Sequence, residues 1–148
     1  MIERVVVATD GSESVARAVE TAADLADRFE AEVHALYVVA EDDLAGAPDD
    51  VRPAMRESLT ERGEQALGEV ESAADSRVTT VIRTGHPANE IIEYAREIDA
   101  DVVAIGTRGR HGEHRLLLGS VAEEVVRRCP IPVLSVRQLH ATTGSTVS

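Results

Sequence analysis

With 148 residues, of which 43% are hydrophobic and only 2% aromatic, the chain is long enough for one domain whose core comes from Val, Ile, Leu and Ala. The net charge is −12 and all 15 basic residues are Arg, which disfavours nonspecific binding to nucleic acid or to an anionic membrane. The single cysteine, Cys129, excludes an internal disulfide, and no apolar run reaches the ~20 residues of a membrane-spanning helix.

We expect a cytoplasmic protein, because the N-terminus MIERVVVATD lacks the apolar region and small-residue cleavage site of a secretory signal. The acidity suggests a further hypothesis, that the chain comes from a halophile. A salt-rich cytosol would screen the self-repulsion of such a surface. The alternatives are an ordinary solvated acidic surface and, for the missing Lys, GC-rich codon usage.

Short apolar runs alternate along the chain with amphipathic segments. Apolar runs bounded by turn signals predict buried strands at residues 5–8, 33–39, 78–82, 102–105 and 133–136. Apolar residues that recur at steps of three and four predict helices at residues 15–29, 51–70, 88–98 and 120–126. Residues 41–50 and 106–118 are predicted to be loops. The domain is placed at residues 1–137, and residues 138–148 form a polar tail.

This regular alternation of strand and helix predicts an α/β fold. Its sheet is parallel, and right-handed crossovers place helices on both faces. In such sheets ligands bind beyond the carboxyl ends of the strands, where the strand order reverses. The rule selects three segments, namely residues 8–12, residues 38–41 and the loop after the fourth strand.

The third of these segments, residues 106–120, has the features of a phosphate-binding loop. Gly106, Thr107, Arg108 and Gly109 come directly after a strand, and after nine intervening residues Gly119 and Ser120 stand before a helix. Glycines let backbone N–H groups approach an anion, and Ser120 is expected near the N-cap, where free N–H groups attract phosphate. Positive charge within the loop comes from Arg108, Arg110 and Arg115. Ordinary turn glycines and a capping serine explain the same spacing about equally well.

Two common phosphate loops are excluded. A Walker A loop requires Lys, and the chain has none. The dinucleotide fingerprint G-x-G-x-x-G is absent, because the turn at residues 8–12 holds one glycine. His111 and His114 lie in the glycine-rich loop, but no Cys or third ligand is in reach, so a solvated or phosphate-adjacent role is favoured over a metal site.

Residues 1–137 resemble the universal stress protein family. The likeness rests on four segments: VATDGS ending the first strand, LYVV ending the second, GHPANEII after the third, and GTRG…GSVAE followed by CPIPVL. The pattern G-x2-G-x9-G-[S/T], which marks the family's ATP-binding members, is met in full by the glycine-rich loop. The resemblance implies a single Rossmann-like domain with strand order 3-2-1-4-5 that binds ATP.

The resemblance also implies which residues bind the nucleotide. Asp10 matches an acidic residue near the ribose or the metal-bound phosphates, although a carboxylate that closes the turn or caps a helix remains the alternative. The adenosine half matches Ala8, Thr9 and Val38. The phosphate loop starts at Gly106, Thr107, Arg108 and Gly109, and the helix terminus that grips the phosphates matches Gly119, Ser120 and Val121. Arg108 stands where many relatives have His.

Partners and activity follow from the same resemblance. Mg²⁺ would accompany the phosphates, held mainly by phosphate oxygens and water, and AMP or ADP are alternative ligands. Family members usually dimerise through the last strand, so residues 133–136 are expected to pair in a homodimer.

We expect an ATP-binding regulatory module of the stress response without catalytic residues. The alternative is an enzyme that slowly hydrolyses ATP or phosphorylates itself at Ser120 or nearby. A receiver-like switch built on Asp10 is disfavoured because such switches need a Lys.

Overall fold

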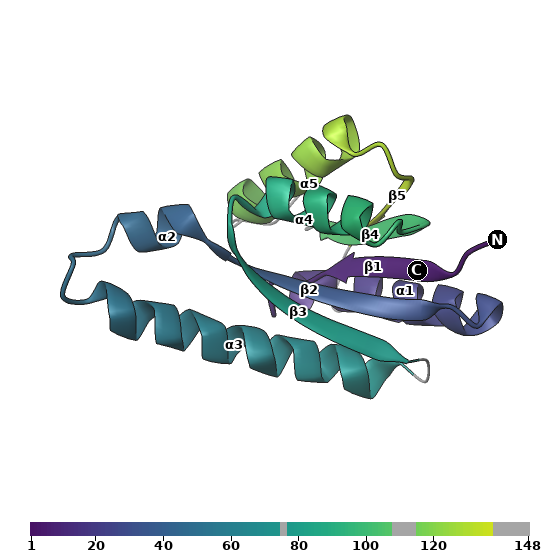
Figure 1. Ribbon diagram of the computed structural model, residues 1–148, viewed down its shortest axis with the longest axis horizontal. Coiled ribbons are helices and arrows are strands. Elements are labelled where there is room, and N and C mark those ends of the chain that lie inside the picture. The colour runs from purple at the N-terminus through teal and green to yellow at the C-terminus, as the bar shows by residue number, and fades with distance from the viewer. Residues whose placement is uncertain (75–76, 108–114, 138–148) are drawn as a thin grey trace, which may run out of the picture.

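A five-stranded parallel sheet forms the centre of the fold (Figure 1). The computed structural model describes residues 1–74, 77–107 and 115–137. In chain order the strands are β1 (Arg4–Ala8), β2 (Glu32–Ala40), β3 (Val78–Gly85), β4 (Val102–Thr107) and β5 (Val133–Arg137). They lie side by side as β3-β2-β1-β4-β5, and every neighbouring pair is parallel. The predicted strand order and α/β fold are therefore confirmed.

Helices cover both faces of this sheet (Figure 1). One face carries α1 (Ala16–Phe29) and α3 (Arg52–Ala73), and the other carries α4 (Pro87–Glu97) and α5 (Arg115–Arg128). Two short helices complete the described elements: η1 (Glu13–Val15), a 3₁₀ turn, and α2 (Glu41–Ala45), which continues directly from β2. Within the three described stretches, no helix combines the length and apolar character needed to cross a membrane.

The valine run of β1 explains why this strand is central. Val5 and Val7 join the core beneath α1 and α3, whereas Val6 joins the core beneath α4 and α5. All three side chains are completely buried. Successive side chains point to opposite faces of a strand, so a strand buried on both faces has to be apolar at every position.

Two predicted loops are partly wrong. Residues 41–45 form α2, since three acidic residues in its first turn favour a helix N-terminus and Leu44 anchors it in the core. Residues 106 and 107 extend β4 by pairing with β5, and α5 begins at Arg115. Ser120 therefore lies in the second turn of α5 rather than at its N-cap, because the sequence RLLL at 115–118 favours helix.

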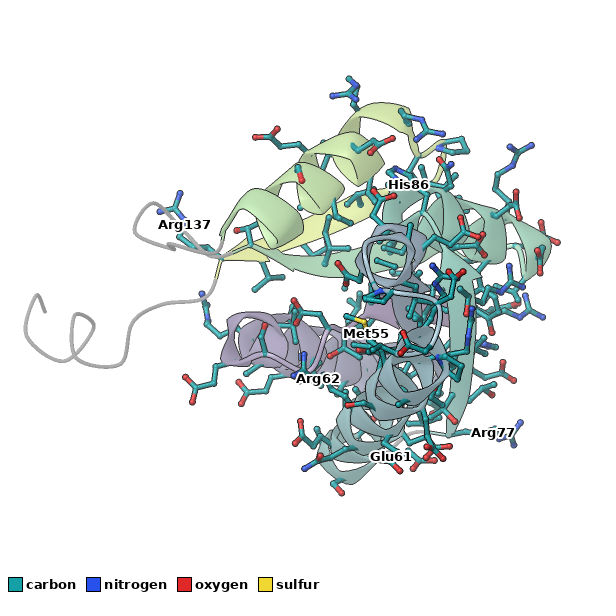
Figure 2. All side chains as sticks on the ribbon, turned by 90° about the vertical axis from the view of Figure 1, so that its left-hand side faces the viewer. Met55, Glu61, Arg62, Arg77, His86 and Arg137 are labelled. Atoms are coloured by element: carbon teal, nitrogen blue, oxygen red, sulfur yellow. The ribbon has the colours of Figure 1, made fainter. Side chains whose placement is uncertain are left out.

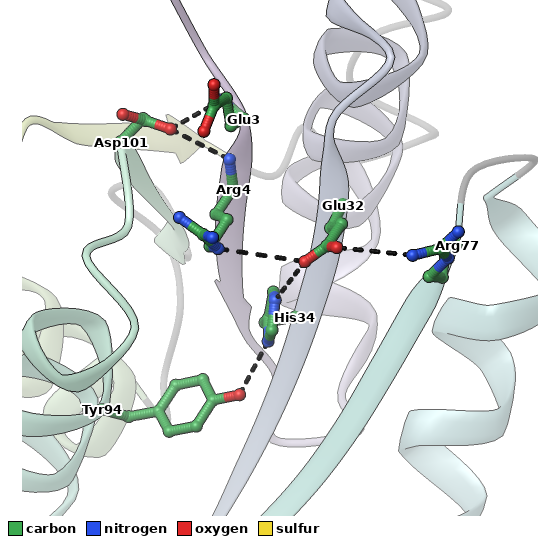
Figure 3. A network of polar contacts seen from close by, with 7 residues as sticks. All are labelled: Glu3, Arg4, Glu32, His34, Arg77, Tyr94 and Asp101. Carbon is green, nitrogen blue, oxygen red and sulfur yellow. Dashed lines mark hydrogen bonds and ion pairs between the residues drawn. The ribbon is translucent and has the colours of Figure 1, made fainter.

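A network of polar contacts closes the amino edge of the sheet (Figure 3). Glu32 at the start of β2 is paired with Arg4 and Arg77 at 4.0 and 3.5 Å, and its Oε1 lies 3.2 Å from Nε2 of His34. Nδ1 of the buried His34 lies 2.7 Å from the hydroxyl of Tyr94 on α4. Every member of this set thus has a partner within the protein.

Candidate functional site

A cavity of about 320 Å³ opens at the opposite, carboxyl edge of the sheet. Figure 2 views the molecule from this side. Its walls come from the ends of β1, β2 and β4 and from α2, α3, α4 and α5. Because β1 lies between β2 and β4, the chain leaves β1 where the order of strands reverses. The cavity therefore occupies the place at which open α/β sheets bind ligands.

Six of the eleven predicted site residues line this cavity. They come from the end of β1, from β2, from β4 and from α5, and they are Ala8, Thr9, Asp10, Val38, Gly106 and Val121. Thr107, Gly119 and Ser120 are described but are not among the lining residues. Arg108 and Gly109, like His111 and His114, lie outside the described residues. The residues predicted to contact adenosine, together with Asp10, thus line one cavity. Of the residues predicted for the phosphates, one on β4 and one on α5 join them.

The turn after β1 holds Asp10 at the cavity by hydrogen bonds within the turn itself. The Oδ1 atom of Asp10 accepts a hydrogen bond from the backbone N–H of Ser12 at 2.9 Å and another from its hydroxyl at 2.6 Å. The hydroxyl oxygen of Thr9 accepts one from the backbone N–H of Gly11 at 3.1 Å. Gly11 has φ of +81°, which a residue with a side chain rarely adopts. Asp10 therefore closes the turn, which was the alternative to a nucleotide-binding role. It also lines the cavity.

The position of Ser120 changes how α5 can contribute to an anion site. Free backbone N–H groups occur only in the first turn of a helix, and α5 begins five residues before Ser120. The prediction that Ser120 marks the helix terminus is wrong for this reason. Val121 and Ala122 line the cavity from the side of α5, so the second turn of this helix contributes apolar surface.

The wall formed by α2 and α3 carries residues that sequence reasoning missed. Tyr37 of β2, Asp43 of α2 and Arg62 of α3 line the cavity together with Asp10. Within the described residues, the side chain of Arg62 makes neither an ion pair nor a hydrogen bond. A side chain on Gly63 would meet the ring of Tyr37 at 2.5 Å, so this glycine allows α3 to pack directly against the tyrosine.

The sequence held one usable signal for this wall. A glycine inside a helix costs about 1 kcal/mol relative to alanine, and α3 holds Gly63 in its interior. Gly63 marks a close contact with β2 and is the neighbour of Arg62 in the chain, but Gly68 in the same helix meets nothing within 4 Å, so the glycine signal alone does not distinguish the two positions. Figure 2 labels Arg62 on α3 at the carboxyl side of the molecule.

Charges around the hydroxyl of Tyr37 show how these side chains are grouped. Burial raises the pKa of Tyr37 above its usual value, Arg62 opposes the rise, and Asp10 and Asp43 add to it. All three charged groups are therefore near enough to act on one phenol. They are also the only charged residues among the described lining of the cavity, which consequently carries two acidic groups and one basic group.

On the other face of the sheet, an exposed hydrogen bond links the two helices that form the remaining wall. His86 precedes α4, and its Nε2 lies 3.1 Å from Oε1 of Glu124 on α5. Glu124 also pairs with Arg128, and the pKa of Glu124 is lowered by the hydrogen bond from His86 and by that from Arg128. Pro87, next to His86, lines the cavity. This pair thus ties α4 to α5 at the side of the site.

Comparison with known proteins gives a consistent result. A model described as the universal stress protein family matches residues 1–137. A universal stress protein of Methanocaldococcus jannaschii is 38% identical over 142 residues, which cover 93% of this chain and 84% of that protein. The likeness therefore extends over nearly the full length of both chains.

Solved structures show the same extent of similarity. The universal stress protein UspA from Lactobacillus plantarum is 27% identical, with a TM-score of 0.72, over 91% of this chain and 97% of that one. A universal stress protein whose structure holds cAMP is 26% identical, with a TM-score of 0.69, over 93% of this chain and 98% of that one. That second protein binds an adenine nucleotide.

Proposed function

The chain belongs to the universal stress protein family, and from that premise we propose that it is a regulatory module of the stress response that binds ATP in the cavity at the carboxyl edge of the sheet. One observation carries the proposal: residues predicted for the nucleotide from four separate segments line a single cavity. Its volume of about 320 Å³ lies at the lower end of the roughly 300–1,000 Å³ of small-molecule sites. The cAMP complex of a similar protein supports a ligand of this class.

The lining of the cavity suits a nucleoside. Leu36, Val38, Ile91 and Ile105 supply apolar surface between the sheet and α4, against which the face of a base can pack. Gly106 adds backbone without a side chain at the end of β4. In this proposal the phosphates extend beyond Gly106 toward the glycine-rich segment, whose residues 108–114 lie outside the described part of the chain.

Mg²⁺ belongs to the proposal as a companion of the phosphates. The described residues hold no group of three His, Cys, Asp or Glu side chains that could form a metal site of their own. Asp10 and Asp43 are the carboxylates in the described lining of the cavity. Magnesium is commonly held by one or two carboxylates together with phosphates and water, and in this proposal Asp10, in the turn after β1, supplies the carboxylate.

Ligand-dependent stability tests the proposal. Mg-ATP at about 100 times its dissociation constant should raise the free energy of unfolding by about 2.7 kcal/mol. Val121→Trp should abolish the gain by filling the cavity. Val126→Trp is the matched control, because Val126 lies on the same helix, is 53% exposed and does not line the cavity. An unchanged unfolding temperature of the wild type in millimolar Mg-ATP would refute ATP binding.

A second candidate function, self-phosphorylation, has one contact in its favour. The hydroxyl of Ser12 donates a hydrogen bond to the carboxylate of Asp10 at 2.6 Å, and both residues line the cavity. In this alternative the Ser12 oxygen attacks the γ-phosphorus of ATP, its proton passes to Asp10, and ADP leaves. Mass spectrometry after incubation with Mg-ATP tests it. One added phosphate that persists in Ser120→Ala and vanishes in Ser12→Ala would favour the alternative.

We also propose a homodimer formed through β5. This strand lies at the edge of the sheet and pairs only with β4 among the described strands. An unpaired strand edge favours pairing with another chain. Two-fold pairing would bring the exposed Ser135 of both copies close together. Ser135→Glu should therefore weaken the dimer in analytical ultracentrifugation, and a wild-type monomer at all concentrations would exclude it.

The acidic surface leads to the last part of the proposal, a cytoplasmic protein of a halophile. The net charge of −12 opposes the compact state unless salt screens it. Thermal unfolding should then occur at a higher temperature in molar KCl than in dilute buffer. Equal stability in both would remove the halophile hypothesis and leave the nucleotide site untouched.

A further inference from the structure

The cavity has two chemically different ends. Between α4, α5 and the sheet its lining is apolar, whereas Asp43 of α2 and Arg62 of α3 line the same cavity with Tyr37 at its other end. These two charged side chains come from different helices, and no ion pair joins them to each other within the described residues. A ligand placed between them would therefore face a hydrogen-bond acceptor on one side and a donor on the other.

The charge at this end is unfavourable for phosphates. Asp43 offsets the charge of Arg62 in the cavity, and Glu69 adds a further negative charge in the hollow that continues past Arg62 along α3. A triphosphate placed here would meet the carboxylates of Asp43 and Glu69 and only one guanidinium. An uncharged group that both donates and accepts hydrogen bonds meets no such opposition.

Adenine presents such a group along one edge. Its exocyclic amino group donates a hydrogen bond beside the ring nitrogen N7, which accepts one, whereas guanine presents two acceptors at the same positions. A carboxylate can only accept and a guanidinium can only donate. Resting on the proposed function, we infer that Asp43 and Arg62 bind this edge of adenine, Asp43 accepting from the amino group and Arg62 donating to N7, and that the pair selects adenine over guanine.

Calorimetric titration of the full chain with ATP, GTP and adenosine tests this assignment. Arg62→Gln should weaken ATP and adenosine by the same factor, about tenfold for one charge-assisted hydrogen bond, because the lost contact is to the base. The matched control is Arg56→Gln. Arg56 is exposed on the same helix and does not line the cavity, so both affinities should stay unchanged.

Asp43 provides the second arm. Asp43→Asn should bring the affinities for ATP and GTP closer together by about tenfold, because an amide can donate to the carbonyl oxygen of guanine. Asp42→Asn is the control, since Asp42 is an exposed neighbour on α2 that does not line the cavity. Asp42→Asn should preserve the discrimination of the wild type.

The outcomes separate this inference from the proposed function. If Arg62→Gln weakens ATP more than adenosine, Arg62 contacts phosphate and the inference is wrong although ATP binding stands. The same holds if Arg62→Gln behaves like Arg56→Gln, or if Asp43→Asn leaves the discrimination intact. If the wild type binds neither ATP nor adenosine, the proposed function fails and the inference fails with it. Thermal unfolding of each variant verifies that it is folded.

Discussion

The amino and carboxyl edges of the sheet both carry charged side chains, but they arrange them differently. At the amino edge Glu32 binds Arg4, Arg77 and His34, and His34 in turn binds Tyr94 (Figure 3). At the carboxyl edge Arg62 has no ion pair within the described residues, and it borders a cavity. The amino edge satisfies these polar groups internally, whereas the carboxyl edge leaves the side chain of Arg62 available to a ligand.

This difference separates stability from binding. A buried polar group that loses its partner costs about 1–3 kcal/mol, so changes at the amino edge should lower stability and leave ligand affinity intact. Changes to exposed polar groups usually alter stability by less than about 0.5 kcal/mol. Changes to Arg62 or Asp43 should therefore affect binding and leave stability nearly unchanged. Four predictions follow this distinction, in order of decreasing effect on stability.

The largest effect is expected at Gly63, where the carboxyl edge depends on close packing. The new Cβ of Gly63→Ala would lie 2.5 Å from Cδ2 of Tyr37, and overpacking of this kind costs about 1–3 kcal/mol. Gly68→Ala in the same helix meets nothing within 4 Å and should stabilise by about 1 kcal/mol through helix propensity. Urea unfolding of both variants checks the prediction, and equal effects would contradict the contact with Tyr37.

Removing the hydroxyl of Tyr94 comes next and probes the amino edge. Tyr94→Phe keeps the ring but removes the hydroxyl that lies 2.7 Å from Nδ1 of His34. The His34 residue is buried, with 8% of its surface exposed. We expect a loss of about 1.5 kcal/mol in the free energy of unfolding, measured by urea denaturation. The affinity for ATP should not change. A loss of affinity for ATP without a loss of stability would contradict the view that the amino edge serves stability and the carboxyl edge serves binding.

The third prediction concerns Asp101, which accepts hydrogen bonds from the backbone N–H groups of Glu3 and Arg4 at 2.6 and 3.0 Å. These bonds, that from Glu3 first, lower the pKa of Asp101. Its stabilisation is therefore fully present above the unfolded-state pKa of about 4 and is lost as the pH falls through the lower folded-state pKa. Asp101→Asn should be less stable than the wild type by about 1 kcal/mol or less near neutral pH.

The pH dependence supplies the check on Asp101. The difference in unfolding free energy between wild type and Asp101→Asn should shrink as the pH is lowered below about 4. If the difference stays constant over this range, the carboxylate is not held by the backbone N–H groups of Glu3 and Arg4. Urea unfolding at several pH values gives the measurement.

The elements that the sequence predicted best are those in which every residue is buried. The run Val5–Val7 is apolar at every position, and only a strand buried on both faces satisfies that pattern. The rule that ligands bind at the carboxyl ends of strands then located Asp10, Val38 and Gly106 at one cavity. The buried central strand and the position of the cavity could thus be predicted from the residues themselves, whereas the strand order was implied by the family resemblance.

The sequence could not predict the remaining features because they depend on packing between elements. Helix α3 is polar over most of its length, so its composition does not reveal which charged residue faces the cavity. Gly63 lets α3 approach Tyr37, and the adjacent Arg62 lines the cavity. Ser120 was misplaced for a related reason, since where α5 begins depends on residues 115–118 as well as on the glycine pattern.

The smallest effect on stability, within about 0.5 kcal/mol, is expected for Arg62→Gln, and its signature is a titration. Arg62 lowers the pKa of Tyr37 against the stronger effect of burial, so the substitution should raise that pKa further. The chain has two tyrosines, and a Tyr94→Phe background leaves Tyr37 as the sole tyrosine whose ultraviolet absorbance reports ionisation. Arg56→Gln in the same background should leave the titration in place. An unmoved titration in Arg62→Gln would show that the guanidinium is remote from the phenol, and the carboxyl edge would then lack the donor on which recognition of the base depends.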